Sequence, residues 1–192
     1  MRRIEEYWIE FNPQNEEKTN PLLNACYEVI DSIKGAAVVV FLIFALVFRV
    51  VGVDGDSMNP TLNDGDWVAV TSTVSGYEQG DIIVITQPWE KNVPIIKRVV
   101  AVGGDTVYID FNKNEVYVNG ELLDEPYIAQ PTRLHYDVQF PLTVEEGKLF
   151  VMGDNRNDSL DSRSSKIGMI DERYVLGKAV FRLSPASEWK IY

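Results

Sequence analysis

The chain has 192 residues and a formal net charge of −11, because 29 acidic residues outnumber 18 basic ones. This length allows one domain with its own hydrophobic core in addition to a membrane segment. The acidic balance argues against nucleic acid as a partner, since a protein that binds a polyanion needs a basic face. The single cysteine, Cys26, excludes an internal disulfide.

The most apolar stretch, residues 35–53, reads GAAVVVFLIFALVFRVVGV and contains one charged residue, Arg49. As a helix it would reach about 28 Å, which is close to the thickness of the hydrocarbon core of a bilayer. A secretory signal peptide would lie nearer to the N-terminus and end in a small-residue cleavage site. We therefore predict a transmembrane helix over residues 35–53, and a buried core helix is the alternative.

The basic residues predict the orientation of this helix. No Lys or Arg occurs between residues 54 and 90, whereas the segment before the helix carries several. Because cytoplasmic flanks of membrane helices are enriched in basic residues, we expect residues 1–34 in the cytoplasm and a domain of residues 54–192 outside. The chain is thus expected to be a single-pass protein of the cell membrane, in contact with the lipid bilayer. The basic residues of the first segment are Arg2, Arg3, Lys18 and Lys34.

Residues 20–34, NPLLNACYEVIDSIK, have a helical pattern. Asn20 is a typical N-cap, Pro21 suits the first helical position, and apolar residues recur at helical spacing. We predict an amphipathic helix on the inner membrane surface, within the cytoplasmic segment.

Beyond residue 54 the pattern changes to short apolar runs that are separated by Gly, Asp and Asn. No long helical period competes with them, so the predicted fold class is mainly β, an all-β domain of mixed antiparallel strands. DFNKNEV and VNGE are typical of turns, and DERYVLG of one short helix. Residues 124–147 contain three prolines and little periodicity, which indicates an irregular excursion over the surface. The predicted strands are WVAVTS, DIIVITQP, IIKRVVAV, TVYIDF, EVYVNG, KLFVMG and VLGKAVFRLS.

Ser57, in the stretch DGDSMNPTLNDGD, is a candidate nucleophile directly after the membrane segment. A serine nucleophile needs a base, and the single histidine, His135, falls in the irregular excursion, which argues against a Ser-His-Asp triad. The sequence has no Cys, His and carboxylate cluster with metal-ligand spacing, so no metal site is expected. The aspartates around Ser57 are interpreted as turn-capping and strand-capping residues: Asp54, Asp56, Asp64 and Asp66.

Lys97 is the remaining candidate base, because it lies in the apolar sequence VPIIKRVVAVGG. A lysine at its reference pKa of about 10.4 is charged and cannot accept a proton, but burial can lower that pKa by about 3–5 units. A buried Lys97 could therefore activate Ser57. The alternative is a lysine that points to solvent from an edge strand.

Four segments, in order, resemble the signature boxes of the bacterial type I signal peptidases. The resemblance covers residues 35–185 and implies that Ser57 is the nucleophile and Lys97 the general base of a Ser-Lys dyad. Position 55 is glycine, where Gram-negative members carry a serine that helps to bind the oxyanion, so the chain is more similar to the Gram-positive branch. The four segments are SMNPTL at 57–62, GDIIVI at 80–85, KRVVAVGGDTV at 97–107 and GDNRNDSLDSR at 153–163.

The resemblance also implies roles for residues that support the dyad. Ser159 matches the family serine that hydrogen-bonds the lysine amine, and Asp161 with Arg163 matches an ion pair that holds the site together. Arg98 is implied as structural support. The residues 154–156 of the last box are expected to shape a turn.

The implied reaction is endoproteolysis of secretory precursor proteins after small-x-small motifs such as Ala-x-Ala, through an acyl-enzyme and without a cofactor. The precursor is expected to add as a strand between the segment before Ser57 and the segment before Lys97. The expected walls of its binding pocket are Met58, Ile83, Ile85 and Ile96.

Two other functions stay open from the sequence. The self-cleaving SOS-repressor proteases also present Gly-Asp-Ser-Met and a lysine on a similar β-domain, but they are cytoplasmic. A membrane-tethered β-domain that binds precursor peptides without cutting them is the second alternative. The apolar span and the GDNRNDSLDSR box argue against the first, and the intact dyad argues against the second.

Overall fold

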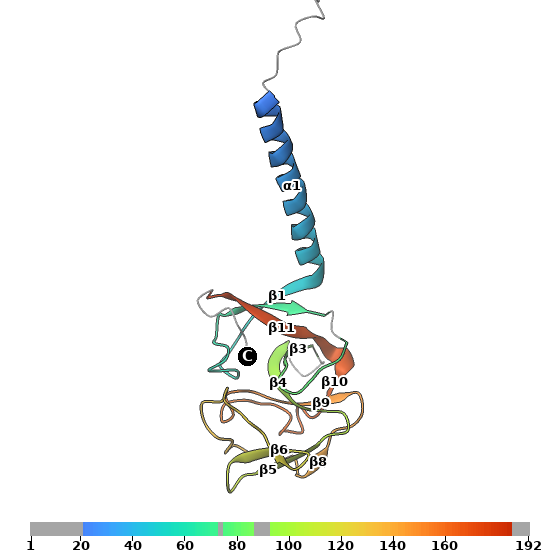
Figure 1. Cartoon of the computed structure of the whole chain (residues 1–192). Coiled ribbons are helices and arrows are strands. Elements are labelled where there is room, and N and C mark those ends of the chain that lie inside the picture. Colours follow the sequence, from blue (N-terminus) through green and yellow to red (C-terminus); the bar gives the residue numbers. More distant parts are fainter. Residues whose placement is uncertain (1–20, 73–74, 87–92, 186–192) are drawn as a thin grey trace, which may run out of the picture. The chain divides into compact units, whose positions relative to one another are not determined.

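The computed structural model describes residues 21–72, 75–86 and 93–185 (Figure 1). Helix α1 spans Pro21–Val47 and so begins at the predicted proline, whereas the expected N-cap Asn20 lies outside the described residues. Its 27 residues reach about 40 Å, enough to cross a bilayer core of about 30 Å. Within the described ranges it is the one helix that is long and apolar enough to do so. The two predicted N-terminal segments therefore form one continuous helix.

The end of the apolar stretch is a strand. Helix α1 ends at Val47, and β1 (Phe48–Gly52) pairs antiparallel with β2 (Trp67–Thr71). The prediction of a helix up to residue 53 is therefore wrong at this end, and Arg49 lies on a strand. An apolar run rich in β-branched residues is compatible with either element, and here a partner strand satisfies its backbone groups. The β-domain thus begins at β1, a few residues earlier than predicted.

The larger sheet of the domain is antiparallel throughout, as predicted. Among the described residues its strand order is β1-β2-β11-β3-β4-β9-β10, so β3 and β4 lie in the middle. The predicted short helix is a 3-10 turn, η1 (Glu172–Tyr174). The remaining strands of this sheet are β3 (Ile82–Ile85), β4 (Ile95–Val102), β9 (Lys148–Met152), β10 (Ile170–Asp171) and β11 (Val175–Ser184).

The smaller sheet lies at the opposite end of the domain from β1 and β11 (Figure 1). Its order in the described part of the chain is β7-β6-β5-β8. The predicted turns contain Asn114 and Asn119, whose φ angles of 61° and 55° suit the left-handed region that Asn tolerates. The strands are β5 (Thr106–Asp110), β6 (Glu115–Val118), β7 (Glu121–Leu122) and β8 (Leu142–Thr143).

Strands β3 and β4 are covered on both faces, and this burial positions the site. One face packs in a cluster that includes Met58, Val68 and Val84. The other face packs in a cluster that includes Ile83, Ile85, Val99, Leu149, Val151 and Ile170. The polar side chains of Lys97 and Arg98 on β4 are therefore shielded from water.

Candidate active site

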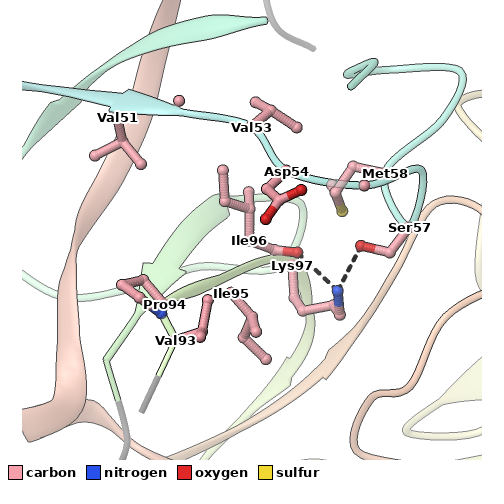
Figure 2. Close-up of a pocket in the computed structure, with 12 residues that line it drawn as sticks. Val51, Val53, Asp54, Ser57, Met58, Val93, Pro94, Ile95, Ile96 and Lys97 are labelled. Atoms are coloured by element: carbon pink, nitrogen blue, oxygen red, sulfur yellow. Dashed lines mark hydrogen bonds between the residues drawn. The ribbon is translucent and has the colours of Figure 1, made fainter. Parts of the chain in front are cut away.

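Ser57 and Lys97 are in direct contact, although they come from different parts of the domain (Figure 2). Ser57 lies in the turn that follows β1, and Lys97 lies near the start of β4, opposite Ile83 of β3. The Lys97 Nζ donates hydrogen bonds to the Ser57 Oγ at 2.7 Å and to the Ile96 carbonyl oxygen at 3.0 Å. The expected nucleophile and the expected base are thus brought together.

Burial changes the acid-base behaviour of Lys97. The residue is only 3% exposed, so the expectation of a buried lysine holds and the solvent-facing alternative is wrong. Desolvation of the ammonium group lowers the pKa of Lys97 from 10.5 to about 8, against a smaller opposing effect of Asp161 and Asp154. The neutral amine, which can accept a proton, is therefore accessible slightly above neutral pH.

Asn155 holds the backbone of the candidate nucleophile. Its N–H donates to the Ser57 carbonyl oxygen, and its side-chain Nδ2 donates to the Asp56 carbonyl oxygen, each at 3.1 Å. The sequence suggested only a turn-shaping role for Asn155. The turn itself is held by Asp64, whose carboxylate accepts the N–H of Gly55 at 2.9 Å, and Gly55 has a φ of +91° that favours glycine.

Arg98, next to the lysine on β4, forms a buried two-point ion pair with Asp154. The Arg98 Nε and Nη2 lie 2.8 and 2.7 Å from the two Asp154 carboxylate oxygens, and both side chains are at most 1% exposed. The ring of Tyr127 covers the guanidinium at 3.9 Å. Asp154 therefore does more than shape a turn: it compensates a buried charge directly beside Lys97.

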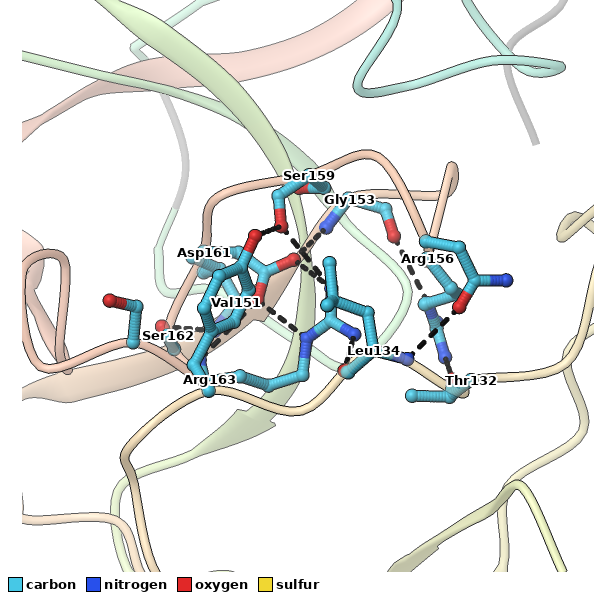
Figure 3. Close-up of polar contacts among 12 residues, drawn as sticks. Thr132, Leu134, Val151, Gly153, Arg156, Ser159, Asp161, Ser162 and Arg163 are labelled. Atoms are coloured by element: carbon cyan, nitrogen blue, oxygen red, sulfur yellow. Dashed lines mark hydrogen bonds and ion pairs between the residues drawn. The ribbon is translucent and has the colours of Figure 1, made fainter. Parts of the chain in front are cut away.

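Asp161 and Arg163 form a second buried two-point ion pair (Figure 3). Both N–O distances are 2.8 Å, and neither side chain is exposed. Asp161 also accepts the N–H of Gly153 at 3.0 Å, and Arg163 donates to the Leu134 carbonyl oxygen at 2.7 Å. The pair expected from the resemblance is formed, and it joins the 153–163 loop to the excursion.

Ser159 is buried beside the dyad, but it does not make the expected hydrogen bond. Its Oγ has no hydrogen-bond partner among the described residues, and the Lys97 amine contacts Ser57 and Ile96 instead. The Ser159 carbonyl oxygen accepts from Tyr136 at 3.0 Å. The hydrogen bond from Tyr136 holds the Ser159 backbone in place, while the Ser159 hydroxyl makes no hydrogen bond with any described residue.

Arg156 is a third buried arginine, and its partners could not be read from the sequence. Its guanidinium forms an ion pair with Glu125 and donates to the Thr132 hydroxyl at 3.2 Å and the Gly153 carbonyl oxygen at 3.0 Å. Glu125 and Thr132 belong to the segment that was predicted as a surface excursion. Although most of that segment is irregular, these side chains point inward, because each buried arginine requires compensation.

A cavity of about 240 Å³ opens at the dyad, between residues 51–58 and residues 93–97 (Figure 2). Met58 and Ile96 line it, as expected. Ile83 and Ile85 do not, which corrects the prediction that they form pocket walls: both are 0% exposed and pack in the core cluster behind the sheet. The lining residues are Val51, Gly52, Val53, Asp54, Gly55, Ser57, Met58, Val93, Pro94, Ile95, Ile96 and Lys97.

The β4 wall of this cavity has an unpaired edge. Residues 95–97 pair with β3 on one side, whereas the ladder to β9 begins only at Arg98. Within the described ranges no strand occupies the other edge of residues 95–97. A peptide in extended conformation can therefore add to β4 beside Lys97.

His135 has no place in this arrangement. It is exposed and packs against the ring of Phe111, at a centroid distance of 5.1 Å. It does not line the cavity that contains Ser57 and Lys97.

A serine hydroxyl in contact with a buried amine, on the wall of an apolar cavity in an antiparallel β-domain, defines a hydrolase of the serine peptidase class. Residues 26–184 match the family model described as signal peptidase, peptidase S26. The chain belongs to this signal peptidase family. The resemblance drawn from the four sequence boxes is thereby confirmed, and the match supports neither the repressor protease nor the non-catalytic alternative.

Individual relatives agree with this assignment. The chain is 38% identical over 183 residues to signal peptidase I of Bacillus licheniformis, covering 90% of this chain and 96% of the relative. It is 35% identical over 181 residues to signal peptidase IB of Staphylococcus aureus (strain COL), covering 85% and 92%. A solved structure of a signal peptidase I from Enterococcus faecalis V583 is 31% identical, with a TM-score of 0.43, and covers 55% of this chain and 98% of that one.

Proposed function

We propose that this protein is a membrane-anchored signal peptidase that removes signal peptides from secreted precursors, with Ser57 as nucleophile and Lys97 as general base. The observation that carries the proposal is the 2.7 Å hydrogen bond between Lys97 Nζ and Ser57 Oγ on the wall of an apolar cavity. A serine hydroxyl is a weak nucleophile until an adjacent base takes its proton.

The reaction follows from these two groups. Neutral Lys97 takes the proton of the Ser57 hydroxyl while the oxygen attacks the scissile carbonyl carbon. The resulting ammonium returns the proton to the leaving amine as the peptide bond breaks, and an acyl-enzyme remains on Ser57. Lys97 then deprotonates a water molecule that attacks the ester, which releases the signal peptide and restores the serine.

The negative charge on the carbonyl oxygen needs a hydrogen-bond donor. The backbone N–H of Ser57 makes no hydrogen bond with any described residue, and the Asn155 contacts hold this part of the backbone in place. A fixed N–H at the nucleophile can stabilise the oxyanion without reorganising. Gly55 provides no side-chain donor, so backbone groups carry this role.

The cavity supports cleavage after small residues. An extended precursor that adds to the open edge of residues 95–97 would place alternate side chains against Met58 and Ile96. A cavity of about 240 Å³ that must also hold the peptide backbone leaves room for small side chains. We therefore propose a small-x-small motif such as Ala-x-Ala before the cleaved bond.

Helix α1 supplies the membrane anchor in this proposal, with residues 1–34 in the cytoplasm and the β-domain outside. The support is the length and apolarity of α1 and the basic residues before it. Protease added to right-side-out vesicles should digest the β-domain and spare the N-terminal segment. Protection of the β-domain instead would contradict the proposed orientation.

The cleavage reaction itself is tested with the full-length protein in detergent. A precursor with Ala-x-Ala before the cleavage site is incubated with the wild type and with Ser57→Ala, and the products are identified by mass spectrometry. A single cut after the second alanine, present with the wild type only, is the expected result. A cut at another site, or an equal cut by Ser57→Ala, would overturn the proposal.

A further inference from the structure

Apart from the dyad of Ser57 and Lys97, the cavity has one polar side chain among the described residues of its walls, and it is acidic. Asp54 lies three positions before Ser57, is exposed, and lines the cavity on the wall formed by residues 51–58, facing β4 (Figure 2). The side chains around the cavity are otherwise mainly aliphatic: Val51, Val53, Met58, Val93, Ile95 and Ile96. A peptide in the cavity would therefore meet one carboxylate near the bond to be cut.

Asp54 does not stabilise the turn in the way that Asp64 and Asp66 do. Asp64 accepts the N–H of Gly55, and Asp66 accepts the N–H of Asn63, each at 2.9 Å. These two residues are the capping acids that the sequence predicted. Asp54 and Asp56, by contrast, make no side-chain hydrogen bond and no ion pair with any described residue, so that interpretation does not hold for them.

Asp54 is also separate from the charges that act on the general base. The charged groups that shift the pKa of Lys97 are Asp161, Asp154 and Arg163. The carboxylate of Asp54 thus lies in the substrate cavity without belonging to the buried network around the dyad. Its position leaves it available to a side chain of the bound peptide.

We infer that Asp54 determines specificity by favouring a basic over an acidic side chain at one precursor position a few residues before the cleaved bond. This inference rests on the proposed function, because it assumes that a precursor occupies the cavity. The Asp54 carboxylate attracts a basic side chain of the bound peptide across the cavity and repels an acidic one. Ion pairs with solvent access typically change affinity by about two- to fivefold, and the aliphatic walls reduce the screening by water.

The alternation of side chains along an extended peptide indicates which peptide position faces Asp54. Successive side chains point to opposite sides, so the small residues that enter the cavity are separated by residues that point toward its mouth. Asp54 is exposed and so lies at the mouth. The charge preference is therefore expected at the residue between the two small ones or at the residue two positions before it, that is, at positions −2 or −4 from the cleaved bond.

The test uses a precursor series with Lys, Gln or Glu at positions −4, −2 and +1, and kcat/KM is measured with the full-length protein in detergent. At −2 or −4 the wild type should cleave the Lys substrate about five times faster than the Glu substrate, and 0.5 M salt should reduce this ratio. Asp54→Asn should bring the ratio close to one, and Asp54→Lys should invert it. Asp56→Asn, which removes the same charge from a residue outside the cavity, should keep the wild-type ratio.

Two results would overturn the inference: a Lys to Glu ratio near one for the wild type at all three positions, or a ratio that Asp54→Asn leaves unchanged. An equal loss of the ratio in Asp56→Asn would show that the net charge of the protein, and not Asp54, is responsible. Absence of cleavage by the wild type would instead contradict the proposed function. In that case the affinity of Ser57→Ala for the Lys and Glu peptides, with and without Asp54→Asn, still decides the role of Asp54.

Discussion

Gly153 lies so close to Ser57 that no side chain fits between them. A Cβ on Gly153 would be 2.4 Å from the Ser57 carbonyl oxygen and 2.3 Å from the Ser159 hydroxyl. The Gly153 N–H is held by the buried Asp161 carboxylate, so this loop cannot move away freely. The spacing between the 153–163 loop and Ser57 therefore depends on glycine at this position.

Gly153→Ala should displace the Ser57 backbone and reduce kcat/KM at least about a hundredfold, because small misplacements of reacting groups cost this much. The loss should appear in kcat more than in KM. Gly35→Ala is the matched control, since nothing lies within 4 Å of a Cβ at that position. Normal turnover by a folded Gly153→Ala protein would show that the contact is not needed.

Ser57→Ala and Lys97→Ala should each abolish cleavage of a precursor while the circular dichroism spectrum stays that of the wild type. The first removes the nucleophile and the second removes the group that activates it. His135→Ala should keep the rate within about twofold, because imidazole takes no part in the proposed reaction. Turnover by either purified dyad variant would rule out the proposed mechanism.

Cleavage should increase with pH through an apparent pKa of about 8, since Lys97 must be neutral to accept the serine proton and burial lowers its pKa from 10.5 to about 8. The measurement is kcat/KM against pH for the wild type and for Ser159→Ala. Because the Ser159 hydroxyl has no partner in the described chain, its removal should change the rate little and leave the midpoint in place. A wild-type midpoint near 10.5 would contradict the effect of burial.

Lys97→Met should increase the free energy of unfolding at pH 7. The folded-state pKa of Lys97 is lower than the unfolded one, so the unfolded chain binds more protons between about pH 8 and 10.5, and stability rises with pH across that window. Below pH 8 the buried Lys97 ammonium lowers the free energy of unfolding by about 3 kcal/mol, since each pKa unit corresponds to about 1.36 kcal/mol. The loss of two hydrogen bonds offsets part of this, so a gain of about 1–3 kcal/mol is expected from urea unfolding in detergent. A less stable variant at pH 7 would contradict this prediction.

Glu125→Gln should destabilise the fold by about 2–4 kcal/mol, because it removes the charge that compensates Arg156, whose side chain is 0% exposed. Glu145→Gln is the control, since Glu145 pairs with Lys148 at the surface and its side chain is 64% exposed. Surface pairs contribute at most about 1 kcal/mol. Equal effects of the two substitutions on the urea midpoint would show that the buried Glu125–Arg156 ion pair contributes no more to stability than a surface pair.

Local patterns in the sequence predicted much of this protein. Short apolar runs between turn residues predicted the antiparallel β-domain, because strands and turns depend mainly on neighbouring residues. The four signature boxes indicated Ser57 and Lys97. The local pattern gave a wrong prediction where a helix and a strand have the same apolar composition. The Val-rich residues after α1 were predicted as helix and are strand β1, since pairing with β2 decided between the two.

The contacts within the site were decided by the tertiary structure alone. The sequence could not show that Glu125 compensates Arg156, that Asp154 pairs with Arg98, or that Ile83 faces the core and not the cavity. In each case the outcome depends on which distant segments meet at a buried charge or cover a strand. Burial and charge compensation act through space, so they appear only once the chain has folded.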